Sequence, residues 1–513
     1  MREVRVGIGP VSFEDVVAVA RQDARVVVTD EALAEVAATR HSIEALAAQD
    51  RPVYGVSTGF GALATKHIPQ EKRAQLQLSL IRSHAAGSGE AVEREVVRAM
   101  MLLRLSTMAS GRTGVRPVVV DTYAALLNAR LTPVVHEYGS LGCSGDLAPL
   151  AHCALAAMGE GEVTDAAGVR RPAAEALSAA GIEPLVLAEK EGLALINGTD
   201  GMLGQLVLAC HDLASLLTTV DVVAAMSVEG LMGTDRVFAQ DLHAMRPHPG
   251  QGESAANMRA LLESSPIVAR HRDDPDCPIV QDAYSVRCAP QVTGAARDTL
   301  AHARLVAGRE LASVIDNPVV TPDGRVESNG NFHGAPVAYV LDFLAIAVAD
   351  VASMSERRTD RFLDVNRNHG LPPFLAHDPG VDSGHMILQY MQAGVVAELK
   401  RLAAPASVDS IPSSAMQEDH VSLGWHAARK LRRSLDGLAR VLAGEALTAA
   451  RALDLRGIGS APATAAVVAA IREVVDGPGP DRHLAPEIEA AVRLVKSGAL
   501  VSAAESVGGP LGG

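Results

Sequence analysis

GSLGCSGDLAPLAH, at residues 139–152, is a glycine-rich turn that leads directly into an apolar segment. Half of its residues are glycine, serine or alanine, so little side-chain bulk surrounds the backbone. A backbone this bare can turn tightly or approach a ligand closely. Two interpretations are open at this point. The stretch is either a turn that caps a helix, with Ser144 or Asp146 as the N-cap, or a segment whose backbone itself takes part in chemistry.

The segments around this turn predict a mainly α-helical protein. Apolar residues make up 48% of the 513 residues, and aromatic residues only 3%. Alanine, valine and leucine dominate, and such side chains pack helix against helix. We expect an N-terminal part over residues 1–115, which contains a loop with Tyr54. A long central bundle with C-terminal helices is expected over residues 116–513.

Helical patterns and turn signals locate the elements along the chain. VRVGIG (4–9) is predicted as a short strand, and the capping-box spacing of Ser12 and Asp15 predicts a helix directly after it. A short hairpin is expected near residues 160–171. Long helices are predicted at residues 31–48, 71–86, 92–109, 117–130, 203–231, 294–315, 335–356, 384–403 and 420–454.

The charge and the cysteine content bear on the class of protein. The formal net charge of −14 disfavours a nucleic-acid or anionic-membrane partner, because no basic tract compensates for it. The most apolar long stretch, residues 204–231, is interrupted by polar and charged side chains, so no membrane span is expected. The five cysteines are odd in number and lack metal-site spacing. We therefore expect a reduced, cytoplasmic protein with no metal site, which ends in a frayed GGPLGG tail at residues 508–513.

Several other glycine-flanked breaks between the helices each carry polar side chains. In a helical protein such breaks lie at helix ends and kinks, where binding sites form. Taken singly, each group also has an ordinary structural explanation. Glu418 and Asp419, for example, fall at an expected helix start, where acids complement the helix dipole. The breaks are PVYGVSTGFGALAT (52–65) with Tyr54, SHAAGSG (83–89) with His84, INGT (196–199) with Asn197, QDAYSVRCAPQ (281–291) with Gln281, Tyr284 and Arg287, ESNGNFHGAP (327–336) with Phe332, and QEDHVS (417–422) with Glu418.

Together these breaks supply a phenol, an imidazole, an amide, a guanidinium and a carboxylate, a set that suits acid–base chemistry on a small amino acid or carboxylic acid. Acid–base groups alone accelerate proton removal by only about 10²–10⁴-fold, so an electrophile is also needed. Cys143-Ser144-Gly145 can provide one if the Gly145 nitrogen attacks the carbonyl carbon of residue 143 and Ser144 loses water. A nucleophilic Cys143 is the alternative, although no general base is evident for it.

GSLGCSGDLAPLAH closely resembles the prosthetic-group motif of the aromatic amino-acid ammonia-lyases. In that family an Ala-Ser-Gly tripeptide cyclises autocatalytically to 4-methylidene-imidazol-5-one (MIO). Cys143 replaces the usual alanine, but the side chain at this position is not consumed. The resemblance therefore implies that MIO forms from Cys143-Ser144-Gly145 and that no external cofactor is needed.

The resemblance extends over about residues 50–430 and implies a role for each break. VYGVSTGFG is similar to the loop whose tyrosine, here Tyr54, removes the substrate's β-proton. INGT is similar to the segment whose asparagine, here Asn197, contacts the prosthetic group and the substrate. The block QDAYSVRCAPQ and the turn NFHG imply four further residues: Tyr284 near the amine, Arg287 on the carboxylate, Gln281 in substrate binding and Phe332 against the prosthetic group.

Two motifs point to one branch of the family. SHAAG (83–87) and QEDHVS (417–422) resemble the histidine-specific lyases, in which His84 and Glu418 would hold the imidazole ring. The implied reaction converts L-histidine to trans-urocanate and ammonia, the first step of histidine breakdown. A tyrosine lyase or aminomutase is the alternative, because tyrosine-specific members also use a histidine near position 84. The resemblance further implies a fumarase/aspartase-like helical fold and a homotetramer whose active sites take residues from three subunits.

Overall fold

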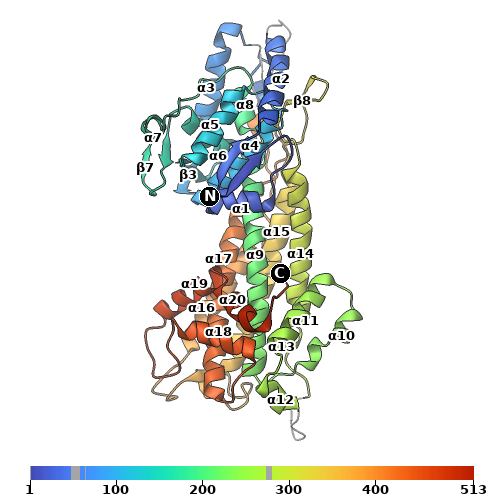
Figure 1. The fold of residues 1–513 in the computed structure, drawn as a ribbon, viewed down its shortest axis with the longest axis vertical. Coiled ribbons are helices and arrows are strands. Elements are labelled where there is room, and N and C mark those ends of the chain that lie inside the picture. Colours follow the sequence, from blue (N-terminus) through green and yellow to red (C-terminus); the bar gives the residue numbers. More distant parts are fainter. Residues whose placement is uncertain are drawn as a thin grey trace. The chain divides into compact units, whose positions relative to one another are not determined.

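The computed structural model describes residues 2–47, 58–59, 61–63, 65–66, 68–272 and 280–512. The described chain is mainly α-helical, which confirms the predicted fold class (Figure 1). The predicted boundary after residue 115 lies in the loop between two helices and stays a prediction. The chain forms two compact units: unit 1 comprises Met1–Leu208, Ala303–Asp342 and Pro405–Arg429, and unit 2 comprises Ala209–His302, Phe343–Ala404 and Lys430–Gly513.

The N-terminus of unit 1 folds as the sequence predicts. Helix α1 (Phe13–Arg21) begins with a capping box: the Asp15 amide donates to Ser12 Oγ at 3.1 Å, and the Ser12 amide donates to Asp15 Oδ2 at 3.2 Å. The predicted strand is β1 (Glu3–Val6), which pairs in parallel with β2 (Arg25–Val28). Alternate residues of β1 are buried, so one face of this two-stranded ribbon lies on the core.

The core of unit 1 is built around α4 (Arg94–Ala109), in which every residue after Glu95 is buried. One of these buried residues is an arginine that spans the core. Arg98 donates hydrogen bonds to the carbonyl oxygens of Val19 at 3.0 Å and Leu127 at 3.1 Å. Because a buried guanidinium is costly unless it is paired, these bonds select one packing arrangement for α4.

The predicted helices before residue 130 and the predicted hairpin are confirmed in unit 1, and further short elements complete it. The helices are α2 (Asp30–Ala47), α3 (Arg73–His84), α5 (Pro117–Asn128), α6 (Leu147–Ala157), α7 (Ala173–Ala179) and α8 (Glu191–Ile196), with the 3₁₀ turns η1 (Gly61–Leu63), η2 (Gln70–Lys72) and η5 (Ser414–Met416). The strand β3 (Ser88–Ala91) pairs with β5 (His136–Tyr138), and β8 (Val319–Val320) pairs with β9 (Val326–Glu327). In a three-stranded sheet, β6 (Glu162–Thr164) lies between β4 (Thr132–Pro133) and β7 (Arg170–Pro172) and pairs with both.

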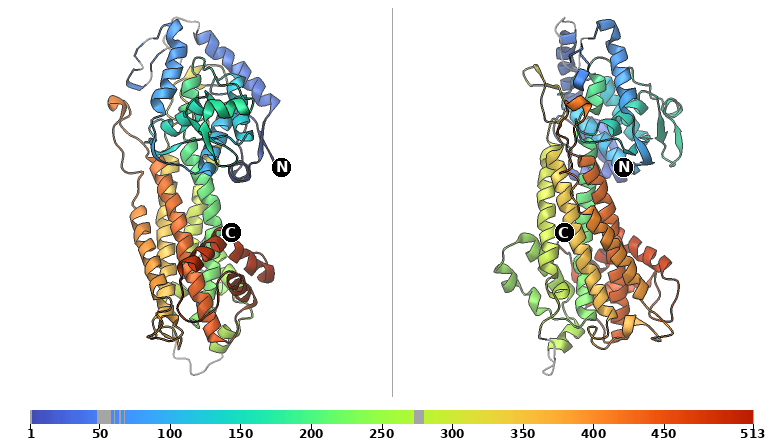
Figure 2. Two further views of the ribbon diagram at one scale, coloured as in Figure 1. Left: turned by 90° about the vertical axis from the view of Figure 1, so that its left-hand side faces the viewer. Right: turned by 180° about the vertical axis from the view of Figure 1, so that it is seen from behind.

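In unit 2, segments of five long helices run side by side as a bundle (Figures 1 and 2). A buried carboxylate joins three of them, because Glu445 accepts hydrogen bonds from Ser227 at 2.7 Å and Ser355 at 2.5 Å and pairs with Arg358. The long helices are α9 (Asp200–Gly230), α14 (Ala289–Leu311), α15 (Ala335–Leu363), α16 (Met386–Leu402) and α17 (Gly424–Arg456). Around them are η3 (Arg236–Phe238), η4 (Pro373–Leu375), α10 (Gln240–Ala244), α11 (Pro249–Leu261), α12 (Pro266–Arg272), α13 (Tyr284–Arg287), α18 (Pro462–Arg472), α19 (Ala485–Lys496) and α20 (Ala499–Gly508).

The C-terminal tail is held against unit 2, so the predicted fraying is wrong for residues 509–512. The Gly512 amide donates to Asn257 Oδ1 at 2.8 Å, and Asn257 Nδ2 donates back to the Gly512 carbonyl at 2.9 Å. Asn257 Nδ2 also donates to the buried Asp221, which pairs with Arg297 at 2.8 Å. The sequence predicts fraying because glycine has no side chain to pack. In the structure, the Asn257 side chain instead bonds the backbone amide and carbonyl of Gly512.

Within the described residues, two helices are long and apolar enough, by length and composition alone, to cross a membrane. They are α9 and α15, and 78% and 61% of their most apolar windows are buried inside the protein. Core helices of a bundle show the same combination of length and burial.

A buried histidine at the start of α16 links the stability of unit 2 to pH. His385 Nδ1 lies 3.1 Å from Thr448 Oγ1. Burial, together with the smaller effect of nearby cations such as Arg451, lowers the pKa of His385 from 6.5 to about 3. Between these two pKa values the unfolded chain binds a proton that the folded chain does not. The free energy of unfolding therefore falls as the pH drops from 6.5 towards 3.

We expect His385→Gln to remove this acid sensitivity. For the unmodified chain, His385 should lower the free energy of unfolding by about 1.4 kcal/mol for each pH unit below its ordinary pKa. Urea unfolding at several pH values between about 4 and 6.5 measures the slope, which should be shallower in the variant. The exposed His377→Gln is the control and should leave the slope unchanged. Equal slopes in all three proteins would contradict a buried, neutral His385.

Candidate active site

The Cys143-Ser144-Gly145 tripeptide forms a tight turn that lies against the INGT segment. Gly145 has a φ of +82°, and a Cβ atom added there would lie 1.9 Å from the Gly198 carbonyl oxygen. The amide of Asp146, the residue after Gly145, donates a hydrogen bond to the Gly198 carbonyl oxygen at 2.7 Å and so holds the two segments together. Both the left-handed backbone and the close approach require glycine at position 145.

Asp146 anchors the turn rather than capping the helix that follows. It is the N-cap of α6 by position, but its carboxylate makes no cap hydrogen bond. Oδ1 accepts from Ser140 Oγ at 2.9 Å and Oδ2 accepts from the Met202 amide at 2.7 Å. Burial raises the pKa of Asp146 to about 7, although these hydrogen bonds oppose the rise. The turn is thus tied to the start of α9. Asp146 occupies the N-cap position, as one interpretation of the sequence predicts, but its side chain does not cap α6.

A cavity of about 270 Å³ in unit 1 gathers four of the residues that the sequence singled out. Its wall includes the end of α3, the turn at 139–148 and the segment at 413–418. Residues far apart in the chain therefore face one space. The four predicted residues that line it are His84, Cys143, Gly145 and Glu418.

His84 enters the cavity wall from the last turn of α3, where a hydrogen bond fixes its tautomer. Its Nδ1 lies 2.9 Å from the Leu80 carbonyl oxygen, which can only accept, so Nδ1 carries the proton. Burial lowers the pKa of His84, and the Leu80 carbonyl and the Glu418 carboxylate raise it in part. The ring is therefore neutral at neutral pH, and Nε2 is its hydrogen-bond acceptor.

Glu418 does not lie at a helix start, so that part of the prediction is wrong. The helix α17 begins only at Gly424, and Glu418 pairs instead with Ser413 in a short antiparallel bridge. The Ser413 amide donates to the Glu418 carbonyl at 2.8 Å, and Ser413 Oγ donates to Glu418 Oε2 at 3.0 Å. These bonds replace helical ones and aim the carboxylate at the cavity that both residues line.

The environment of Cys143 disfavours its use as a nucleophile. Burial raises the pKa of its thiol to about 12, and the nearby Glu418 carboxylate contributes to the rise. The thiolate is the reactive form of cysteine, and it is a negligible fraction at neutral pH when the pKa is this high. The alternative of a Cys143-dependent hydrolase or transferase therefore lacks support from the site.

The described part of the predicted tyrosine loop reaches the same wall. Tyr54 itself lies outside the described residues. The Ala62 amide donates to Ser414 Oγ at 3.4 Å, and a Cβ atom added at Gly61 would lie 3.7 Å from Glu418 Oε1. The end of this loop therefore lies beside the segment that carries Glu418.

Asn197 and Phe332 belong to segments that adjoin the turn. Asn197 is 1% exposed and directly precedes Gly198, whose carbonyl accepts from the Asp146 amide. Phe332 is half-buried in the turn before α15, and neither Phe332 nor Asn197 is among the residues that line the cavity. Its neighbour His333 stacks on His420 with 5.7 Å between ring centroids.

The remaining three predicted residues lie in unit 2, whereas the cavity lies in unit 1. Tyr284 begins the short helix α13 and is 71% exposed, and Gln281 is exposed as well. The Arg287 guanidinium carbon lies 4.8 Å from the centre of the Tyr284 ring. Arg287 Nε is buried without a hydrogen-bond partner, so this guanidinium retains a donor for a ligand.

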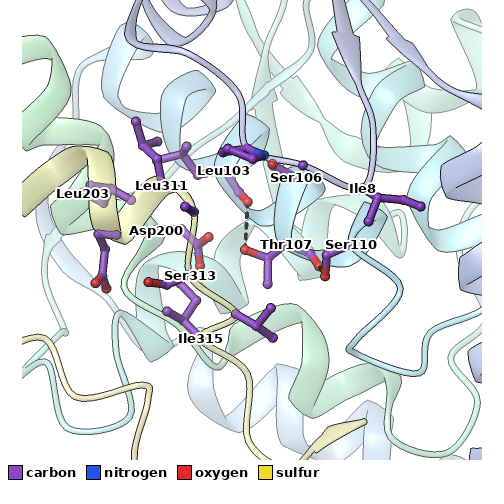
Figure 3. A pocket seen from close by; sticks show the side chains of 15 residues that line it. Ile8, Leu103, Ser106, Thr107, Ser110, Asp200, Leu203, Leu311, Ser313 and Ile315 are labelled. Carbon is purple, nitrogen blue, oxygen red and sulfur yellow. Dashed lines mark hydrogen bonds between the residues drawn. The ribbon is translucent and has the colours of Figure 1, made fainter. Parts of the chain in front are cut away.

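A second cavity in unit 1, of about 150 Å³, shows groups that sequence reasoning missed (Figure 3). Residues of α4 and the start of α9 line it, among them Thr107 and Asp200. Asp200 pairs at 3.4 Å with the buried Arg104, which donates to the Asn197 carbonyl at 2.7 Å. This arginine therefore holds the backbone of the INGT segment in place. A charge inside the apolar run of α4 is the sequence signal that marks Arg104.

Comparison with known proteins places the chain among related enzymes. A family model described as aromatic amino acid lyase matches residues 11–473. The chain belongs to this family. It is 66% identical to the histidine ammonia-lyase of Streptomyces coelicolor, with all of both chains covered. The family predicted from the motifs and the predicted class of enzyme, a lyase, are both confirmed.

Solved structures of the family share the fold. The tyrosine aminomutase from Streptomyces globisporus is 38% identical, with a TM-score of 0.92 over 98% of each chain. The histidine ammonia-lyase from Trypanosoma cruzi is 36% identical, with a TM-score of 0.90 over 99% of this chain and 95% of that one.

We expect Gly145→Ala to lower the midpoint of thermal unfolding of this lyase more than Gly168→Ala does. Gly168 also has a positive φ, of +79°, but nothing lies within 4 Å of a Cβ added there. Gly168→Ala should cost only the backbone strain, about 1–2 kcal/mol. Gly145→Ala adds the clash with Gly198, which only a backbone movement can relieve. Thermal unfolding of both variants measures the difference, and equal midpoints would contradict the close contact.

Proposed function

We propose that this lyase deaminates L-histidine to trans-urocanate and ammonia. The observation that carries the proposal is the presence of His84 and Glu418 in one cavity with the Cys143–Gly145 turn. The names of relatives that are similar over the whole chain give independent support.

The cavity matches an imidazole better than a phenyl ring. His84 Nε2 is left as an acceptor because Nδ1 donates to Leu80, and the carboxylate of Glu418 is a second acceptor. The imidazole of histidine carries one ring N–H donor when neutral and two when protonated, and a phenyl ring has none. A site built to pair with a polar group rejects an analogue without it by about 10⁴–10⁵-fold, because the site's own polar groups stay unpaired.

We further propose that Cys143, Ser144 and Gly145 form the MIO group. The fit rests on the tight turn, on the bare Gly145 and on a Cys143 thiol that stays protonated. MIO would supply the electrophile that activates the substrate amine as a leaving group. Tyr54 is proposed to take the β-proton, and Phe332 is proposed to lie against the MIO group.

Binding of the substrate carboxylate and amine is assigned to the unit 2 residues. Arg287 would bind the carboxylate through paired N–H donors, with Tyr284 and Gln281 beside the amine. We propose that the active form is a cytoplasmic homotetramer in which neighbouring copies complete each site. Exposed apolar side chains on long helices of unit 2, at Phe343, Ile346, Ile387 and Tyr390, support such an assembly.

A tyrosine lyase or aminomutase is the second candidate, because the tyrosine aminomutase from Streptomyces globisporus shares the fold at 38% identity. Ammonia release from histidine and from tyrosine, measured on the same preparation, separates the two. Turnover of tyrosine without turnover of histidine would overturn the proposed substrate.

The intact mass of the purified chain tests whether the tripeptide cyclises. We expect a deficit of two water molecules, because ring closure and dehydration of Ser144 each release one. Ser144→Ala should restore the full mass and abolish activity. Cys143→Ala is the matched control and should keep both the dehydration and the activity, since that side chain is not consumed. A full, unmodified mass for the unaltered chain would refute MIO formation.

Glu418→Gln tests the recognition of the imidazole ring. The amide keeps an acceptor oxygen but loses the charge, and a hydrogen bond to a charged group is worth about 1.5–3 kcal/mol. We therefore expect kcat/KM for histidine to fall by about 10–100-fold. Glu160→Gln, at a surface ion pair with Arg82, is the control and should leave the kinetics unchanged. Unchanged kinetics in Glu418→Gln would show that the carboxylate does not bind the ring.

A further inference from the structure

Hydrogen bonds fix which way the buried carboxamide of Asn197 points. Its Nδ2 donates to the Asn317 carbonyl at 2.9 Å and to Asp316 Oδ1 at 3.4 Å. Both partners are acceptors, so only the NH₂ end of the amide can face them. Asn197 Oδ1 is left buried with no hydrogen-bond partner. An unpaired buried acceptor is costly, so it marks a position where a ligand donates.

A buried ion pair holds the acceptor that orients this amide. Lys190 Nζ lies 2.5 Å from Asp316 Oδ2, and both side chains are fully buried. The other oxygen of Asp316 accepts from the Asn317 amide at 2.8 Å and from Asn197. Burial lowers the pKa of Lys190, and the Asp316 carboxylate raises it in part. Because desolvation offsets the attraction within such a pair, stability alone does not explain its presence.

The segment Asp316–Asn317 also anchors the turn that leads to Phe332. Asn329 Nδ2 donates to the Asp316 carbonyl at 3.0 Å. Asn317 Oδ1 accepts from the Asn329 amide at 2.9 Å and from Ser328 Oγ at 3.1 Å. Asp316 and Asn317 together therefore support two segments of the site that are far apart in sequence: Asn197, through the Asp316 carboxylate and the Asn317 carbonyl, and the turn at Ser328 and Asn329.

We propose that Lys190 and Asp316 are positioning residues that present Asn197 Oδ1 to an N–H group of the substrate amine. Asp316 accepts one N–H hydrogen bond of the Asn197 amide, and this bond turns the amide oxygen away from Asp316 and Asn317. Lys190 holds the Asp316 carboxylate in place through their buried ion pair. Neither residue touches the substrate, and both act through Asn197. This inference rests on the proposed histidine lyase activity.

A double-mutant cycle tests whether the pair acts through Asn197. Lys190→Met/Asp316→Leu removes both charges together, so no unpaired charge is left in the core. We expect kcat to fall by about 100-fold, the effect of a small misplacement of a site group. Asn197→Ala should lower kcat by a similar factor. Adding the double substitution to Asn197→Ala should then cause no further loss, because the group to be positioned is gone. Independent losses that multiply would overturn the proposal, as would an unchanged kcat.

A crystal structure of Lys190→Met/Asp316→Leu gives a readout that does not depend on turnover. We expect the Asn197 carboxamide to rotate away from Asn317, while the mass deficit of the intact chain persists. An unchanged carboxamide would overturn the proposal. The matched control is Arg297→Met/Asp221→Leu, another buried pair, which should lower the thermal midpoint without changing kcat. A comparable loss of kcat in this control would show a general packing effect and overturn the positioning role.

Lys190→Met/Asp316→Asn extends the test if the leucine variant does not fold. Its new amide oxygen can still accept from Asn197, so kcat should stay within about tenfold of the unmodified enzyme. A loss as large as that of Asn197→Ala would overturn the proposal. If the unmodified enzyme does not deaminate histidine, the proposed function fails, and the orientation of Asn197 in the variant structures still decides whether the pair positions it.

Discussion

The contact between the Gly145 turn and the Gly198 carbonyl is the constraint on which the rest of the site depends. No side chain fits between these two backbone segments, and the Asp146 amide closes the contact with a hydrogen bond of 2.7 Å. It brings a turn before α6 against a turn before α9. The helices α6 and α9 both start directly after this pair of turns, so the contact fixes where the two helices begin.

Buried polar and charged side chains hold this pair of turns in place. Arg104 holds the carbonyl of Asn197, Asp146 ties the reactive turn to the start of α9, and the pair of Lys190 and Asp316 holds the Asn197 side chain. Each of these groups is costly to bury, and each is compensated by specific partners. Apolar side chains would fill the same space, but they would not fix the orientation of the neighbouring polar groups. Charged and hydrogen-bonded groups select one orientation, which is what a site with a small substrate requires.

Sequence patterns located most of the helices because apolar periodicity is a local property. The capping box at Ser12 and Asp15 is a local signal of the same kind, and it is confirmed. Predictions failed where long-range contacts decide the local structure. The sequence places Glu418 at a helix start, but Glu418 pairs with Ser413, and the helix begins only at Gly424. The tail near Gly512 looks frayed, but Asn257, some 250 residues away in sequence, holds its backbone.

The sequence by itself determined the family and the chemical groups of the site, because both depend on residue types in a fixed order. It also specified the bare turn, since glycine at position 145 is required by its left-handed backbone. Only the tertiary structure decided the states of these groups. The tautomer of His84, the protonated thiol of Cys143 and the direction of the Asn197 amide each depend on burial and on distant partners. Local sequence does not encode the dielectric or the hydrogen-bond partners that folding brings to a residue.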